Sequence, residues 1–256
     1  MKQMSLTSCP GLITITLAVI FAVAGMQANA DQNSGNSFEK DIFESDSGNL
    51  EITFIGHGTL MFSFGGMVIH ADPWTRLADY QTLPKADIIL ITHEHRDHLD
   101  LQAIEILRKD GTEIVMNPKC AEKVSGGRVM KNGDVLTVKG LKIEAVPAYN
   151  IVHKRDNGEP FHPEGSGNGY ILHFGSRRVY VAGDTENIPE MKDFGKIDIA
   201  FLPMNLPYTM TPEMLADAAN SVQPAILYPY HFGDSDTSAI AGLIKGKTEV
   251  RIRKMK

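Results

Sequence analysis

The stretch Thr92-His93-Glu94-His95-Arg96-Asp97-His98 contains three histidines and an aspartate within a very short span of the chain. It follows residues 86–92, a continuous apolar run typical of a strand that is covered on both faces. It precedes residues 100–109, in which apolar residues recur at helical spacing and a glycine soon follows as a stop signal. The histidine-rich stretch is therefore predicted to form a loop between a buried strand and a helix.

The side chains of this loop are suited to binding metal ions. Neutral imidazole nitrogen and carboxylate oxygen are the usual ligands of zinc-like ions. On a continuous strand or helix they would point to different faces, whereas in a tight turn His93 and His95 can bind one ion. Asp97 and His98 can then bind a neighbouring ion. A solvated polar loop is the alternative interpretation, but the flanking strand and helix favour a metal site.

Strand-like segments dominate the rest of the sequence, and helical segments mostly follow buried strands in each half. This pattern favours an α/β protein, a four-layer αββα sandwich in which each half of the chain supplies one sheet and its outer helices. Strands are predicted at residues 50–55, 60–64, 67–71, 86–92, 113–116, 135–138, 141–146, 170–174, 178–182, 197–203 and 225–230, and helices at 100–109 and 211–222. The last segment is predicted to form one helix and a terminal strand.

The N-terminal part of the chain differs in composition from the rest. In residues 1–30 a single lysine precedes an apolar run, and Ala28-Asn29-Ala30 follows it, which is the order of a secretory signal peptide. The apolar run is shorter than the about 20 residues of a membrane-spanning helix. Residues 31–49 are polar and predicted to form a flexible lead, and residues 50–256 a single domain. We therefore expect a secreted or periplasmic protein with no stable membrane insertion after cleavage.

Charge and cysteine content limit the classes of partner and the disulfides that this chain can have. The formal net charge is −6, with 25 basic and 31 acidic residues, and removal of the signal peptide with its one lysine would make it −7. An acidic chain is a poor match for a phosphate backbone, so nucleic acid is not expected as a partner, and a small-molecule substrate is favoured. Cleavage would leave Cys120 as the one cysteine, which excludes an internal disulfide. The oligomeric state is not predicted by these features.

The His-x-His-x-Asp-His pattern of residues 93–98 resembles the signature of the metallo-β-lactamase superfamily, and the resemblance extends from about Leu50 to near the C-terminus. It implies the same αββα sandwich, with the site at one edge between the two sheets. It also implies two divalent metal ions as cofactors, with zinc the first expectation and manganese or iron as alternatives.

The resemblance assigns roles to three further segments. Asp72, in Ile69-His70-Ala71-Asp72-Pro73, resembles an aspartate that supports the motif loop without touching the metal. Asp184, in Gly183-Asp184-Thr185, resembles the carboxylate that bridges both ions, and His231 resembles the last ligand of the second ion. His70 and His173 lie within strand patterns and are expected to be packed or paired side chains.

One segment departs from the usual pattern. Where many relatives have a third histidine for the first ion, this chain has Asn150, a poor zinc ligand. Residues 148–150 and 161–163 are similar to a small, lactonase-like branch, and we expect His162 to replace the missing histidine, with His153 as the alternative. In the same branch the counterparts of His57 and Tyr208 lie near the substrate, although each could also be an ordinary turn or surface-loop residue.

These features predict a hydrolase. A hydroxide held between two metal ions and oriented by Asp97, the expected catalytic residue, would attack a carbonyl or phosphorus centre. Small esters and lactones rank first as substrates because of the branch resemblance, phosphodiesters second and β-lactams third. A non-enzymatic periplasmic metal-binding protein is the alternative from a different class, whereas a diiron reductase would have a glutamate in place of His95 and a flavin domain.

Overall fold

The computed structural model describes Met1 and residues 38–256. The signal peptide predicted at residues 1–30 lies outside the described residues except for Met1. No helix among the described residues has the length and apolar character needed to span a membrane.

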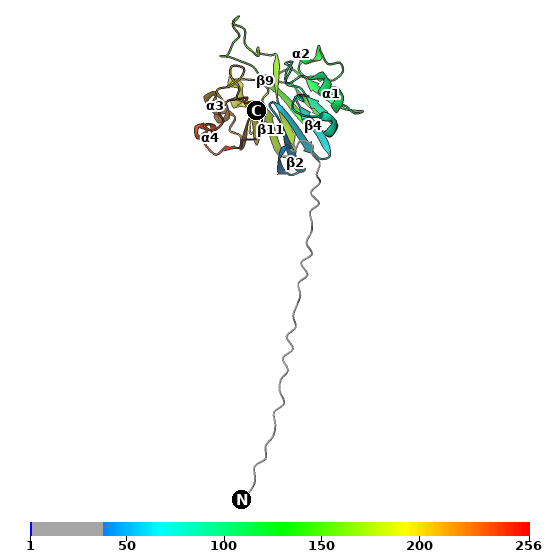
Figure 1. The fold of residues 1–256 in the computed structure, drawn as a ribbon, viewed down its shortest axis with the longest axis vertical. Coiled ribbons are helices and arrows are strands. Elements are labelled where there is room, and N and C mark those ends of the chain that lie inside the picture. The colour runs from blue at the N-terminus through cyan, green and yellow to red at the C-terminus, as the bar shows by residue number, and fades with distance from the viewer. Residues whose placement is uncertain (2–37) are drawn as a thin grey trace. The chain divides into compact units, whose positions relative to one another are not determined.

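Two seven-stranded mixed sheets form the centre of the protein, and each comes from one half of the chain (Figure 1). In the first sheet the strands lie in sequence order: β1 (Glu39–Ser45), β2 (Gly48–Gly56), β3 (Thr59–Phe64), β4 (Met67–Ala71), β5 (Ile88–Leu90), β6 (Glu113–Met116) and β7 (Arg128–Val129). Strands β1 to β4 are antiparallel, whereas β4 to β7 run parallel to one another.

The second sheet has the same plan. Its strands also lie in sequence order: β8 (Val135–Val138), β9 (Leu141–Ala148), β10 (Gly167–Phe174), β11 (Arg177–Val181), β12 (Ile199–Pro203), β13 (Ile226–Tyr230) and β14 (Glu249–Val250). Strands β8 to β11 are antiparallel and β11 to β14 parallel. Each half therefore begins with an antiparallel meander and ends with parallel strands.

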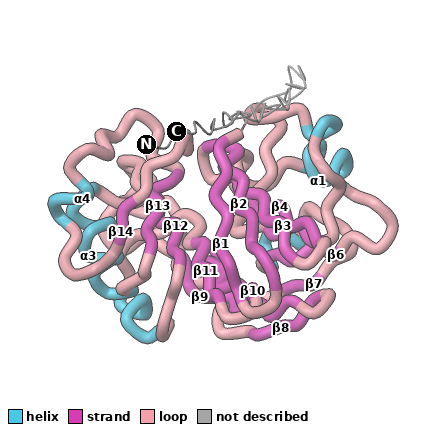
Figure 2. The backbone as a smooth tube through the Cα atoms, turned by 90° about the horizontal axis from the view of Figure 1, so that it is seen from below, coloured by secondary structure: helices cyan, strands magenta, loops and turns pink. Residues whose placement is uncertain are grey.

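Helices cover the outer face of each sheet (Figure 2). Helices α1 (Leu101–Leu107) and α2 (Pro118–Ala121) lie on the first sheet, and α3 (Pro212–Val222) and α4 (Ile240–Leu243) on the second. Asp100 caps α1 and Thr211 caps α3 by accepting hydrogen bonds from the first-turn amides. The αββα prediction is confirmed, and Cys120 is a buried residue of α2.

Aromatic side chains join the two sheets in the central layer. Phe62 of β3 stacks on Phe174 of β10 with ring centroids 5.5 Å apart. Phe54 of β2 contacts Tyr228 of β13 at 5.0 Å, and Tyr228 stacks on Phe201 of β12. This layer buries large apolar surface, the main favourable contribution to folding.

The prediction of a flexible lead over residues 31–49 was wrong for residues 39–49. They form β1 and the start of β2, and Phe43 contributes to the central core. Asp41 pairs with Arg253 at 2.7 Å and hydrogen-bonds Tyr228, which attaches β1 to the opposite half. The polar composition that suggested disorder belongs to an edge strand with one buried side chain.

Candidate metal centre

The predicted site residues lie just beyond the carboxyl ends of strands from both sheets. Asp72 follows β4, and the motif loop of residues 92–98 follows β5. Asp184 follows β11 and His231 follows β13. Two sheets packed face to face thus bring residues from both halves of the chain to one edge.

Asp72 fixes the motif loop, as predicted. It is fully buried, and its Oδ1 accepts a hydrogen bond from the backbone N–H of Thr92 at 2.8 Å. Its Oδ2 accepts the Thr92 hydroxyl at 2.6 Å and pairs with Nδ1 of His98 at 2.7 Å. Because Nδ1 of His98 is engaged, its Nε2 is left to face the cluster.

Eight side chains form two adjacent groups of potential ligands, and within each group the ligand atoms all lie within 4.8 Å of one another. The first group contains His93, His95, His162 and Asp184. The second group contains His57, Asp97, His98 and His231. The motif is thus divided between the groups, with His93 and His95 in the first and Asp97 and His98 in the second.

Asp184 joins the two groups. Its Oδ2 lies 3.3 Å from Nε2 of His162 and 3.8 Å from Nε2 of His93. Its Oδ1 lies 3.4 Å from Nε2 of His98 and 3.5 Å from Nε2 of His231. One oxygen thus faces each group, so this one carboxylate connects the two groups.

The titration behaviour of these residues reflects burial and close charges. Burial lowers the pKa of His93 and His95 and keeps both imidazoles neutral, the form that binds metal. Burial also opposes the charge of His98, but Asp184, Asp72 and Asp97 outweigh it and raise its pKa to about 10. Burial opposes ionisation of Asp97, yet the His231 and His57 imidazoles beside its carboxylate hold its pKa well below the usual range.

The site fits divalent metal ions on two grounds. Nε2 of His93, His98 and His231 and Oδ1 of Asp184 are buried and have no hydrogen-bond partner among the described residues. Buried polar atoms without partners are costly, and here they converge on shared points. The donors are imidazoles and carboxylates, the set that zinc, manganese and iron accept.

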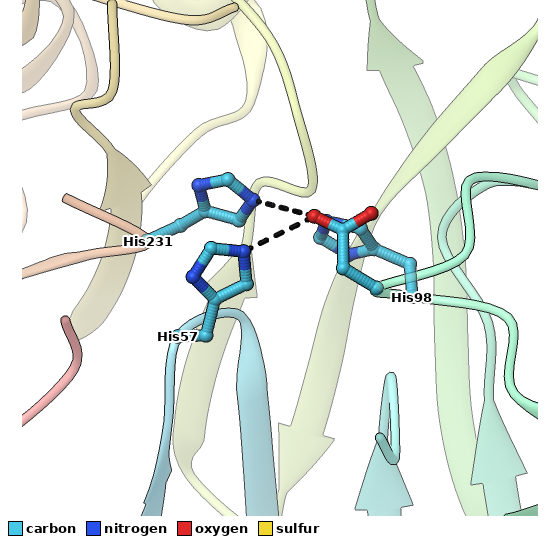
Figure 3. Close-up of side chains that lie close together, drawn as sticks. His57, His98 and His231 are labelled. Atoms are coloured by element: carbon cyan, nitrogen blue, oxygen red, sulfur yellow. Dashed lines mark hydrogen bonds and ion pairs between the residues drawn. The ribbon is translucent and has the colours of Figure 1, made fainter. Parts of the chain in front are cut away.

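His57 takes a position that the sequence did not specify. It adopts a left-handed backbone with φ 49°, and its Nε2 lies 3.1 Å from Oδ2 of Asp97. Its ring packs on His231 at a centroid distance of 3.7 Å, and Figure 3 shows both rings pointing toward one carboxylate beside His98. His57 also lines the cavity above the cluster and is one of the potential ligands of the second group.

The structure separates the two candidates for the missing third histidine. His162 is buried in the first group, with Nε2 3.1 Å from Nδ1 of His95. His153 instead pairs through Nδ1 with Glu186 at 2.7 Å. Asn150 orients His162, because its Oδ1 accepts hydrogen bonds from the backbone N–H at 2.8 Å and from Nδ1 at 2.7 Å.

Glu186, which the sequence analysis missed, holds residues 150–153 in place through hydrogen bonds. It is fully buried, and its carboxylate accepts hydrogen bonds from Asn150 Nδ2 and from the backbone N–H groups of residues 151–153. Burial opposes its ionisation, but these donors outweigh burial and lower its pKa. Its position two residues after Asp184 is the one sequence signal that could have indicated it.

A cavity of about 1060 Å³ opens above the two groups. His95, Asp97, His162 and Asp184 form part of its wall, and Tyr208 also lies in the wall. The Tyr208 ring makes an edge contact with Phe161 at 5.1 Å between centroids. Volume and lining are those of a small-molecule site rather than of a closed structural metal site.

Comparison with known proteins agrees with this geometry. Residues 51–231 match the family model of the β-lactamase superfamily domain. The chain belongs to this superfamily. A UPF0173 metal-dependent hydrolase from Methanopyrus kandleri is 30% identical over 196 residues, which cover 72% of this chain and 84% of the relative.

Solved structures give the same assignment. A protein from Parabacteroides distasonis, assigned as a metal-dependent hydrolase, is 52% identical with a TM-score of 0.82, over 86% of this chain and 100% of that one. Igni18, a metallo hydrolase from Ignicoccus hospitalis, is 26% identical with a TM-score of 0.64, over 80% of this chain and 95% of that one. The protein is thus a metal-dependent hydrolase of the metallo-β-lactamase fold, and the non-enzymatic alternative is set aside.

Proposed function

We propose that this hydrolase cleaves a small ester or lactone at a centre of two divalent metal ions, with zinc the first choice and manganese or iron the alternatives. The observation that carries the proposal is the pair of four-residue groups joined by Asp184 beneath an open cavity. A buried bridging carboxylate supports two neighbouring ions, and the cavity leaves room for substrate and water.

His93, His95 and His162 would hold the first ion, and Asp97, His98 and His231 the second. Asp184 would contact both through its two oxygens. Ions bound there would supply Lewis acidity and a water of lowered pKa.

Asp97 is the residue of this set best suited to act on the attacking water. Its side chain is 32% exposed toward the cavity, whereas that of Asp184 is 4% exposed. Nε2 of His57 lies 3.1 Å from Oδ2 of Asp97, and Nε2 of His231 lies 3.4 Å from the same oxygen. The lowered pKa of Asp97 keeps the carboxylate ionised at neutral pH. An ionised, oriented carboxylate at the cavity floor can accept a hydrogen bond from water and fix its direction.

The cavity wall supplies contacts to the substrate. Tyr208 is half exposed, so its hydroxyl is available to donate to a carbonyl or leaving-group oxygen. Phe161 and Trp74 add apolar surface to the wall. A cavity with aromatic walls suits a small organic ester or lactone better than a long polymer.

The test is hydrolysis of a panel of lactones, esters, phosphodiesters and β-lactams with zinc or manganese restored. Wild type is expected to turn over lactones or esters fastest, and Asp97→Ala to lose turnover because the water is no longer held. Asp110→Ala removes an exposed carboxylate outside the cavity and serves as the matched control. Undiminished turnover by Asp97→Ala would remove the proposed mechanism, and activity confined to phosphodiesters or β-lactams would replace the substrate class.

We also propose that the protein is exported and that residues 1–30 are removed. The support is the order of lysine, apolar run and Ala28-Asn29-Ala30 in the sequence. Mass spectrometry of protein expressed in a host with a secretory pathway is expected to find Asp31 at the N-terminus. Retention of Met1 in all of the protein would contradict export by this route.

A further inference from the structure

The arginines of this protein divide into two sets. The sequence contains nine, and six of them lie within 4.0 Å of a carboxylate: Arg108, Arg128, Arg177, Arg178, Arg251 and Arg253. The other three, Arg76, Arg96 and Arg155, have no such partner among the described carboxylates. These same three arginines line the cavity above the metal centre.

Two of the three are held in place by aromatic rings. The guanidinium carbon of Arg76 lies 5.5 Å from the centre of the Trp74 ring. That of Arg155 lies 5.0 Å from the Phe161 ring, and Arg155 also donates to the Phe161 carbonyl at 3.2 Å. Stacking of this kind orients a guanidinium without neutralising its charge, and the remaining N–H groups stay available to a ligand.

The acidic residues of the cavity are engaged elsewhere. Asp97 and Asp184 belong to the candidate metal groups. Asp100 caps α1 and also accepts hydrogen bonds from the backbone N–H and hydroxyl of Thr75. The three arginines and three aspartates of the lining cancel formally, so any bound divalent ion makes the cavity positive in a protein whose net charge is −6.

We propose that Arg76 and Arg155, together with Arg96 of the same cavity lining, form a subsite for an anionic group, a carboxylate or a phosphate, carried by the substrate away from the bond that is cleaved. This inference rests on the proposed function, because it names the class of ester or lactone that the site accepts. The planar guanidinium matches carboxylate and phosphate oxygens with paired hydrogen bonds.

In this arrangement the residues that would bind the anionic group differ from those that would act on the cleaved bond. Arg76 lies in the loop after β4 and Arg155 in the loop after β9, whereas the candidate ligands converge at the cavity floor. A cavity of about 1060 Å³ accommodates a molecule that reaches from one to the other. Binding energy from a remote charged group is useful to an enzyme because it orients the reacting bond.

The test compares matched nitrophenyl esters with the metal-loaded enzyme. One carries a neutral pentanoyl chain, one a glutaryl chain ending in carboxylate, and one an acyl chain of similar length ending in phosphate. The wild type is expected to prefer the charged esters, and the two charged arms show which group fits. In the Arg76→Gln/Arg155→Gln variant that preference in kcat/KM should fall about 10- to 100-fold, mainly through KM, as loss of two charge-assisted hydrogen bonds implies.

Arg128→Gln is the control, because Arg128 pairs with Glu113 and lies outside the cavity. Calorimetry of glutarate binding to chelator-treated protein gives a readout without turnover, and the double variant should bind glutarate more weakly. Equal hydrolysis of neutral and charged esters, unchanged in the double variant, would overturn the subsite and leave the proposed function standing. Arginine-dependent glutarate binding without hydrolysis of any ester would support the subsite and count against the proposed function.

Discussion

Asn150 stands where the resemblance to the superfamily led us to expect a metal-binding histidine, and it orients His162, which lies 12 residues further along the chain. Its Oδ1 engages both the backbone and Nδ1 of His162. We expect Asn150→Ala to weaken metal binding about 10- to 100-fold, the usual effect of removing a residue that holds a ligand. Competition with a chromophoric chelator measures this change.

His153→Gln is the matched control for that variant. His153 contacts Glu186, as Asn150 does, but lies outside both groups of potential ligands. The His153→Gln variant should therefore keep the metal affinity of the wild type. If both variants lost metal equally, the loop as a whole rather than the Asn150 contact would be responsible, and the assigned role of Asn150 would be wrong.

The residues of the site differ in how far their roles could be predicted from the sequence. His93, His95, Asp97 and His98 lie within one run of six residues, so their spacing alone indicated a shared site. Asn150 and Glu186 act through contacts 12 and 36 residues away, and no local pattern reports such contacts. Asp184 and His231 were assigned because the superfamily resemblance supplied the order of segments.

At the level of elements, the turn between β2 and β3 is shaped to admit two imidazole rings. A Cβ on Gly58 would lie 2.8 Å from Cε1 of His98 and 3.5 Å from Cδ2 of His231. A contact of 2.8 Å to a fully buried ring forces that ring to move. Gly58→Ala should therefore displace His98 and reduce the metal content of the second group, as measured by elemental analysis.

Gly242→Ala provides the comparison for Gly58→Ala. A Cβ on Gly242 meets nothing within 4 Å, and this glycine lies in α4, where alanine is a better helix former. The metal content of the Gly242→Ala variant should equal that of the wild type. Full metal content in Gly58→Ala would contradict the packing argument.

Strand β1 depends on one carboxylate for its attachment to the second half of the chain. Asp41 pairs with Arg253 at 2.7 Å and with Arg251 at 3.5 Å, and accepts the Tyr228 hydroxyl. Asp41→Asn is expected to lower the free energy of unfolding by about 1–3 kcal/mol, since a hydrogen-bonded charge is lost.

The pH dependence of that difference follows from the pKa of Asp41. Burial opposes its ionisation, but hydrogen bonds from Arg253 and Tyr228 outweigh burial and lower its pKa below the ordinary value of 3.8. A depressed carboxyl pKa stabilises the fold above the unfolded-state value, and this contribution disappears as the pH falls through the folded-state value. Urea unfolding should show a wild-type advantage at pH 7 that shrinks below about pH 4. A difference independent of pH would contradict the ion-pair explanation.

Most elements could be predicted from hydrophobic pattern, and β1 shows why one could not. Strands such as β4 and β6 have the bounds that their apolar residues indicated. In β1 only Phe43 is buried, and the remaining side chains face solvent or charged partners. Its position is decided by contacts with Arg253 and Tyr228, which follow it by 212 and 187 residues.

At the scale of the whole molecule, each candidate metal group draws on both halves of the chain. His93 and His95 of the first half meet His162 and Asp184 of the second, and in the other group His231 meets residues of the first half. The central core packs the two sheets together, while the metal centre joins them at one edge. The alignment of the sheets therefore sets the distances between ligands, and metal binding in turn should hold the sheets together.

This coupling predicts that metal stabilises the entire fold. A ligand that binds only the folded state stabilises it by about 2.7 kcal/mol for one site at a concentration 100 times its Kd. Zinc should therefore raise the midpoint of thermal unfolding of chelator-treated protein in a concentration-dependent manner. Asp184→Asn replaces the carboxylate that faces both groups with a neutral amide of similar shape, so most of this rise should be lost. Differential scanning calorimetry at several zinc concentrations measures the effect.

Because the two halves share the ligands, wild type should unfold in one transition that shifts as a whole. A zinc-dependent transition of one half alone would show that the metal centre does not bridge them.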